Sequence, residues 1–135
     1  MKPKDYLNQI ALADSRINNK LEELDQLYAL ATKVTPTLSQ DKGSGFNVSD
    51  KVGNVTAKIV DMKDEINNDL DRYLNLKRDI ITKLDQLNDE RYYTLLHMRY
   101  VHRKKFDVIA TEMGYDYQSI INMHGRALQE FEKLL

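Results

Sequence analysis

The sequence predicts an all-α protein, in which a long, coiled-coil-like N-terminal helical hairpin precedes a small C-terminal helix-turn-helix domain. Hydrophobic residues make up 41% and charged residues 30% of the 135 residues, with only five Gly and two Pro, a composition typical of a folded helical protein. Apolar residues recur every seven positions along two long stretches. Near the C-terminus, a glycine separates two short amphipathic runs. We therefore expect the hairpin in residues 1–88 and the smaller domain in residues 89–135.

The first long helix is expected to begin near Leu7. Its apolar stripe consists of residues seven apart, Ile10, Ile17, Leu24 and Ala31. The pattern stops near Val34, and residues 34–50 contain a proline, two glycines and many Ser, Thr, Asn and Asp. These residue types favour turns over continued helix, so residues 34–50 are predicted to form the loop of the hairpin.

The second long helix is predicted over residues 52–87, about 54 Å at 1.5 Å per residue. Its seven-residue repeat consists of Val52, Ile59, Ile66, Tyr73, Ile80 and Leu87. Asp69 and Lys83 interrupt the seam, which indicates a helical bundle or an imperfect coiled coil. Neither helix can bury its apolar stripe alone. The two helices pack within one chain, or pair with a second chain in a homodimer; the sequence leaves both open.

A break is expected at Asn88 and Asp89. Asp89 is suited to cap a shorter helix over residues 90–103, because an aspartate side chain can accept hydrogen bonds from the first free amides of a helix.

The next segment has the spacing of a helix-turn-helix. Ala110, a small residue, allows a second helix to cross closely; Gly114, four residues later, accepts a left-handed turn; Ile120, six further on, fills the angle between the helices. Asp116 can cap the second helix through the amide of Ser119. The remaining core residues are expected to be Ile109, Met113, Met123, Ala127 and Leu128. A plain helical corner is the alternative interpretation.

The charge distribution suggests where a polyanion would bind. Residues 1–90 carry 13 Lys and Arg against 16 Asp and Glu, whereas residues 91–126 carry six against three. Duplex DNA is the expected partner of this basic region. The candidate phosphate contacts are Arg99, Arg103, Lys104, Lys105 and Arg126. A solvated helix end that favours cations is the structural alternative for the basic run.

The expected recognition helix starts at residue 117 and would place its first turns in the major groove. The candidate base-reading residues are Tyr117, Gln118, Ser119, Ile121 and Asn122. Gln and Asn can each pair with adenine N6 and N7, and Ile121 could contact a thymine methyl group. We therefore expect an A·T-containing site.

The stretch "LLHMRYVHRKKFDVIATEMGYDYQSIINMHGRAL" (Leu95 to Leu128) resembles the promoter-reading region 4 of bacterial sigma factors. Nearly the whole chain is similar to a family of uncharacterised phage proteins from Gram-positive bacteria, which combine a helical hairpin containing a Gly/Ser loop with an "RY…IA…MGY…HGRAL" ending. Relatives of that family include phage regulators of late transcription. The resemblance implies a sequence-specific DNA-binding role in a phage or prophage, with RNA polymerase as a further candidate partner.

The chain departs from sigma factors at the DNA-reading positions. Sigma factors place several arginines and a glutamate there, whereas Tyr117, Gln118, Ser119, Ile121 and Asn122 are uncharged. We therefore do not expect recognition of the same minus-35 promoter element. The chain also lacks the other sigma regions, so it should not act as a complete sigma factor.

Several other functions are not expected. The chain has no cysteine, no phosphate-binding glycine loop and no nucleophile elbow, so we predict neither an enzyme nor a cofactor. His97 and His102 are five apart rather than the four that would place them on one α-helical face, so no metal site is predicted; His124 should pack or hydrogen-bond within the domain. The absence of a signal peptide and of a long apolar run predicts a cytoplasmic protein that does not enter a membrane.

The sequence thus favours a phage-type transcription regulator. Residues 89–135 would bind duplex DNA, while residues 1–88 would mediate dimerisation or contact with polymerase. Two alternatives are a helical protein–protein interaction module with a host or phage partner, and a DNA-packaging factor such as a small terminase subunit.

Overall fold

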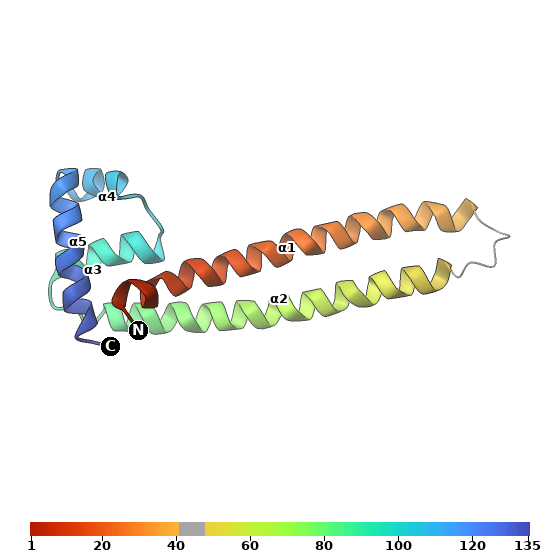
Figure 1. Ribbon diagram of the computed structural model, residues 1–135, viewed down its shortest axis with the longest axis horizontal. Coiled ribbons are helices and arrows are strands. Elements are labelled where there is room, and N and C mark those ends of the chain that lie inside the picture. The colour runs from red at the N-terminus through yellow and green to blue at the C-terminus, as the bar shows by residue number, and fades with distance from the viewer. Residues whose placement is uncertain (41–47) are drawn as a thin grey trace. The chain divides into compact units, whose positions relative to one another are not determined.

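The computed structural model confirms the all-α class (Figure 1). It describes the backbone of residues 1–40 and 48–135, and the side chains of residues 1–33 and 51–135. The described residues contain no strand. The helices are α1 (Pro3–Gln40), α2 (Val48–Leu84), α3 (Glu90–Leu96), a π-helical turn η1 (His97–Val101), α4 (Phe106–Met113) and α5 (Tyr117–Glu132).

The predicted loop over residues 34–50 was too long. Helix α1 continues through Pro36 to Gln40, and α2 already begins at Val48; residues 41–47 lie outside the described residues. A proline in a helix interior removes one backbone hydrogen bond and crowds the preceding turn, so the continuation of α1 through Pro36 runs against the local preference on which the loop prediction rested. At its other end α2 stops at Leu84, before the predicted end at Leu87.

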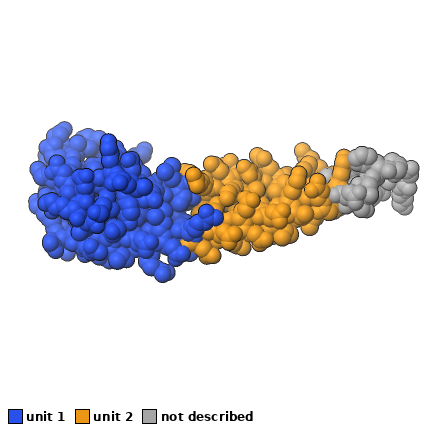
Figure 2. Space-filling model, turned by 60° about the horizontal axis from the view of Figure 1, so that its bottom comes forward, with its two compact units in different colours: residues 1–14, 72–135 blue, residues 15–71 orange. Residues whose placement is uncertain are grey.

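The chain divides into two compact units (Figure 2). Unit 1 combines Met1–Asp14 with Arg72–Leu135, and unit 2 comprises Ser15–Asp71. The boundary predicted between residues 88 and 89 falls inside unit 1. Unit 1 therefore contains the start of α1 and the end of α2 together with α3, η1, α4 and α5.

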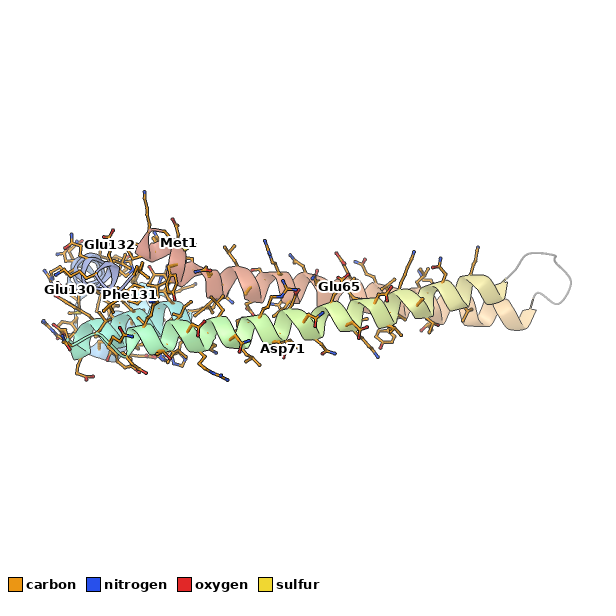
Figure 3. The ribbon with its side chains drawn as sticks, turned by 90° about the horizontal axis from the view of Figure 1, so that it is seen from below. Met1, Glu65, Asp71, Glu130, Phe131 and Glu132 are labelled. Atoms are coloured by element: carbon orange, nitrogen blue, oxygen red, sulfur yellow. The ribbon has the colours of Figure 1, made fainter. Side chains whose placement is uncertain are left out.

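The core of unit 1 consists of two clusters. The main cluster holds the fully buried side chains Leu7, Ile10, Ile80, Leu84, Leu96, Ala127 and Phe131, with Tyr100 and Val101 nearly buried. Phe131, labelled in Figure 3, packs its ring 5.9 Å from that of Tyr6 in α1. The smaller cluster holds Leu95, Ile109, Ala110, Ile120 and Met123. Helix α5 contributes to both clusters, so both of its halves are anchored to the rest of unit 1.

Unit 2 consists of antiparallel segments of α1 and α2. Lys20 Nζ lies 2.6 Å from Asp69 Oδ2, and Lys63 Nζ lies 5.4 Å from the centroid of the Tyr28 ring. The polar interruption of the predicted seam at Asp69 is therefore compensated by an ion pair. In unit 1 the second interruption, Lys83, donates to the Leu134 carbonyl at 3.4 Å.

The connection between α4 and α5 has the predicted turn geometry. Gly114 adopts a left-handed conformation with φ of +76°. Its amide donates to the Thr111 carbonyl at 3.4 Å, and the Tyr115 amide donates to the Ala110 carbonyl at 3.0 Å. This pair of hydrogen bonds is the Schellman arrangement that ends a helix at a left-handed residue.

The other predicted caps are also confirmed. Asp116 Oδ1 accepts from the Ser119 amide at 2.7 Å and starts α5. Asp89 caps α3 by accepting from the Arg91 amide at 2.9 Å. Ala110 and Ile120 are buried as expected.

We predict that Gly114→Ala lowers the free energy of unfolding by about 1 kcal/mol, because a Cβ is unfavourable at positive φ. No atom lies within 4 Å of the added methyl group, so the cost comes from the backbone alone. Gly125→Ala is the matched control: it lies inside α5 in open space and should raise stability by about 0.5 to 1 kcal/mol. Urea unfolding followed by circular dichroism measures both. Equal effects of the two substitutions would contradict the assigned turn.

Candidate nucleic-acid interface

The first turns of α5 divide the predicted base-reading residues into two groups. Tyr117 is 55% exposed, and Gln118 and Asn122 are also exposed. Ser119 and Ile121 are half-buried. Since Ile120 and Met123 are buried in the smaller cluster, the outward face of α5 is the one that carries the two amide side chains.

Gln118 and Asn122 are linked to each other. Gln118 Nε2 donates to Asn122 Oδ1 at 3.1 Å, one helical turn further on. This hydrogen bond leaves Gln118 Oε1 as an acceptor and Asn122 Nδ2 as a donor, because each amide group has more donor and acceptor sites than the bond uses. The exposed pair therefore presents a fixed combination of donor and acceptor to an approaching surface.

Ser119 acts first as part of the helix cap. Its backbone amide and its side chain both hydrogen-bond Asp116, which lowers the pKa of that carboxyl group below its ordinary value. Ser119 is half-buried, whereas Tyr117 and Gln118 before it are exposed. Of the five predicted base-reading residues, Tyr117, Gln118 and Asn122 are the ones that reach furthest into solvent.

The five predicted phosphate contacts differ in whether their side chains already interact with other residues. Lys105 and Arg126 are exposed, and neither forms an ion pair with another described residue. Lys104 pairs with Glu112 at 2.7 Å, and Arg103 pairs with Asp14 from α1. Two of the five cations therefore have to exchange a carboxylate for a phosphate if they are to contact DNA.

Arg99, the fifth cation, belongs to a partly buried aromatic group that we term the His124 cluster (Arg99, Tyr100, Phe106 and His124). The Arg99 guanidinium carbon lies 4.1 Å from the centroid of the Phe106 ring, and Nη1 donates to the Lys104 carbonyl at 3.0 Å. The Phe106 ring meets His124 edge-on at 4.9 Å. Arg99 thus holds the start of α4 in place, a role that sequence reasoning did not identify.

His124 hydrogen-bonds within the domain, as predicted. Its Nε2 lies 2.7 Å from the Tyr100 hydroxyl group, and the two rings stack at 5.8 Å. Burial, followed by the charges of Arg99 and Lys4, lowers the pKa of His124 from 6.5 to about 4. Burial also raises the pKa of Tyr100 to about 12. Both groups are therefore neutral at physiological pH, and they join η1 to the middle of α5.

The π-helical turn brings His97 and His102 together, contrary to the expectation from α-helical spacing. In η1 the His102 amide donates to the His97 carbonyl, five residues back, at 3.1 Å. A π-turn places residues five apart on one face, so the rings of His97 and His102 lie 4.8 Å apart. Burial, with a further contribution from His102, lowers the pKa of His97. Among the described residues, no group of three or more His, Cys, Asp or Glu is placed to hold a metal ion.

Tyr115 was not identified as a site residue from the sequence, and the backbone conformation of Arg103 was not predicted. Tyr115 directly follows Gly114 and is 39% exposed, so it adds an accessible aromatic side chain just before α5. Arg103 adopts a left-handed conformation with φ of +56° after η1, which is uncommon for a residue with a side chain. The single helix predicted over residues 90–103 is therefore wrong beyond Leu96, where the chain enters η1 and then reverses its backbone at Arg103.

Comparison with known proteins identifies the family of this chain. Residues 33–132 match the family described as "Protein of unknown function (DUF1492)". The chain belongs to this family. No curated protein and no solved structure matches the chain. The DUF1492 match ends with α5 and includes α3, η1 and α4, so the amide pair and the His124 cluster both lie within the region that defines the family.

None of the helices in the described part of the chain combines the length and the apolar character needed to cross a bilayer.

We predict that the stability of unit 1 depends on pH through His124. Because its pKa is about 4 in the folded chain and about 6.5 when unfolded, protons bind the unfolded chain more readily. The contribution of neutral His124 to the free energy of unfolding is complete above about pH 6.5 and is lost as the pH falls towards about 4. Allowing for solvent screening of the partly exposed ring, we expect a loss of about 2 kcal/mol.

Urea titrations between about pH 7 and about pH 4.5 test this dependence. His124→Gln should show a smaller loss of stability over this interval than the wild type, whatever its stability at neutral pH. The same pH dependence in both proteins would contradict the role assigned to His124.

Proposed function

We propose that this protein binds duplex DNA in a sequence-specific manner through α5 and regulates transcription in a phage or prophage. The observation that carries the proposal is the exposed, hydrogen-bonded pair of Gln118 and Asn122 on the outward face of α5. The phage assignment rests on the family resemblance of the sequence. The binding mode rests on the geometry of unit 1.

The dimensions and the surface of α5 suit the major groove. The helix has 16 residues, which corresponds to about 24 Å, and the major groove of B-DNA admits an α-helix. Gln118, Asn122 and Arg126 follow one another at four-residue intervals, so they form a stripe along one side of α5. An amide pair followed by a cation matches base edges flanked by a phosphate.

The amide pair favours adenine. Adenine presents an acceptor at N7 and a donor at N6, whereas guanine presents two acceptors. Asn122 retains the donor Nδ2 beside the oxygen that Gln118 already contacts. An amide held in that orientation can donate to N7 and accept from N6, which supports a site that contains A·T pairs.

Few free cations are available for phosphate contacts, so one copy should bind weakly. Lys105 and Arg126 can contact phosphates without breaking an ion pair, whereas Lys104 and Arg103 are paired with Glu112 and Asp14. Either pairing of two chains or contact with RNA polymerase would add to the affinity. Pairing would predict a two-fold repeated DNA site.

A protein-interaction module is the second candidate function. It is favoured by the large apolar side chains that unit 2 leaves exposed, among them Leu21, Leu30 and Val60. The two functions are compatible, because one uses α5 and the other uses the paired segments of α1 and α2.

The proposal is tested by selecting bound sequences from a random duplex library with the full chain. The selected duplex is then titrated by fluorescence anisotropy at about 50 mM salt, beside a scrambled duplex. We expect an A·T-containing consensus and tighter binding to the selected duplex. Absence of binding at this salt concentration would refute DNA binding, and equal affinity for both duplexes would refute sequence specificity.

We predict that Gln118→Ala and Asn122→Ala each weaken binding to the selected duplex by about 1 to 3 kcal/mol. The double variant should lose less than the sum of the two, because the residues form one hydrogen-bonded pair. Gln129→Ala, exposed further along α5, is the control and should bind like the wild type. Unchanged affinity in both single variants would show that α5 does not read bases through this pair.

We predict that Lys105→Gln and Arg126→Gln each reduce the dependence of log K on log salt by about one unit, as expected for one lost phosphate contact. They should weaken selected and scrambled duplexes equally, since phosphates carry no sequence information. Lys133→Gln, beyond the end of α5, serves as the control. A wild-type salt dependence in both variants would exclude these residues as phosphate contacts.

A further inference from the structure

We propose that unit 2 binds a positively charged amphipathic helix of another protein in a groove between its two helical segments. The groove has a volume of about 470 Å³. It is lined by Glu23, Gln26, Leu27 and Leu30 from α1 and by Lys58, Asp61, Met62 and Glu65 from α2. All eight residues belong to unit 2, so the groove is complete within that unit.

The centre of the groove is apolar and incompletely covered. Leu27 and Met62 are half-buried, and Leu30 is 47% exposed. The buried hydrophobic residues of unit 2 are few among its described side chains, Ile17, Val55 and Ile66. Two helices in a single layer cannot enclose side chains that point out of that layer, and a third helix packed into the groove would cover them.

The rim of the groove carries mainly negative charge. Glu23, Asp61 and Glu65 contribute three carboxylates, whereas Lys58 contributes one ammonium group. Glu65, labelled in Figure 3, lies 3.7 Å from Lys20, but the same ammonium group is closer to Asp69, at 2.6 Å. Within the described residues, Glu23 and Asp61 form no ion pair. The rim can therefore accept at least two further cations.

These two properties define the partner. An apolar stripe flanked by Lys and Arg would place its apolar face on Leu27, Leu30 and Met62 and its cations beside the carboxylates, which is the helix-in-groove mode of recognition. The acidic rim would also attract such a partner over a distance. DNA is excluded as the occupant, because a polyanion would be repelled. A second copy that used the same groove in a two-fold arrangement would bring like charges together.

The partner can be characterised with a displayed library of helical peptides of about 18 residues, five turns long. The library carries a fixed leucine stripe at helical spacing and random residues elsewhere. It is selected against the full chain and counter-selected against the triple variant Glu23→Lys, Asp61→Lys, Glu65→Lys. We expect the selected peptides to carry net positive charge at the positions that flank the leucines.

The strongest selected peptide is then titrated into the full chain by fluorescence polarisation. We expect Leu30→Asp and the triple variant each to weaken binding at least about tenfold, since each removes an interaction on which recognition depends. Glu22→Lys is the matched control: Glu22 is exposed next to Glu23 but does not line the groove, and its replacement should leave affinity within about twofold. Asp61→Asn removes one charge but keeps the shape of the side chain, and it should also weaken binding. It therefore tests the acidic rim even if a variant with larger changes fails to fold.

Four results would overturn the proposal. Selected peptides could be neutral or acidic, or no peptide could be selected. Binding could be unaffected by both Leu30→Asp and Asp61→Asn. Light scattering could also reveal a dimer that Leu30→Asp dissociates, in which case a second copy occupies the groove. None of these results depends on DNA binding, so they leave the function proposed for α5 untouched.

Discussion

The left-handed backbone of Gly114 is the constraint on which the candidate site depends. Without it α4 would continue, and the residues that follow would lie on a different face. With it, the amides of Gly114 and Tyr115 donate hydrogen bonds to carbonyl groups of α4. Asp116 then caps a new helix, and Ile120 is buried with Ala110 in the smaller cluster. Gln118 and Asn122 are exposed because those buried positions are fixed.

The His124 cluster extends this constraint to the rest of unit 1. A neutral imidazole joins Tyr100 to α5, and the Arg99 guanidinium packs on Phe106 at the start of α4. Arg99 thereby uses its charge inside the domain. The positive charge of residues 91–126, which the sequence suggested was available to a polyanion, is reduced further by the pairs that Arg103 and Lys104 form. The candidate interface is therefore rich in amides and only moderately basic, which favours a reader of base edges that needs a second contact for affinity.

Sequence patterns predicted the elements that are determined by residues close together in the chain. The seven-residue repeats identified both long helices, and Asp89 and Asp116 were identified as caps because the side chain and the amide it accepts from lie within three residues of each other. Other features depend on distant parts of the chain and could not be predicted. Arg103 pairs with Asp14 across 89 positions, and Tyr100 of η1, the π-turn that brings His97 to His102, hydrogen-bonds His124 of α5 across 24 positions. Spacing rules for α-helices gave the wrong geometry there.

DNA reading by α5 is tested most directly by titrating the selected duplex into isotope-labelled full chain and following the backbone amide signals by NMR. If α5 enters the major groove, the signals of residues 117–126 and of Lys105 change most, while those of Ile120 and Met123 change less than those of Gln118 and Asn122. Changes confined to residues 15–71, or no change at saturating duplex, would contradict the proposal that α5 reads DNA.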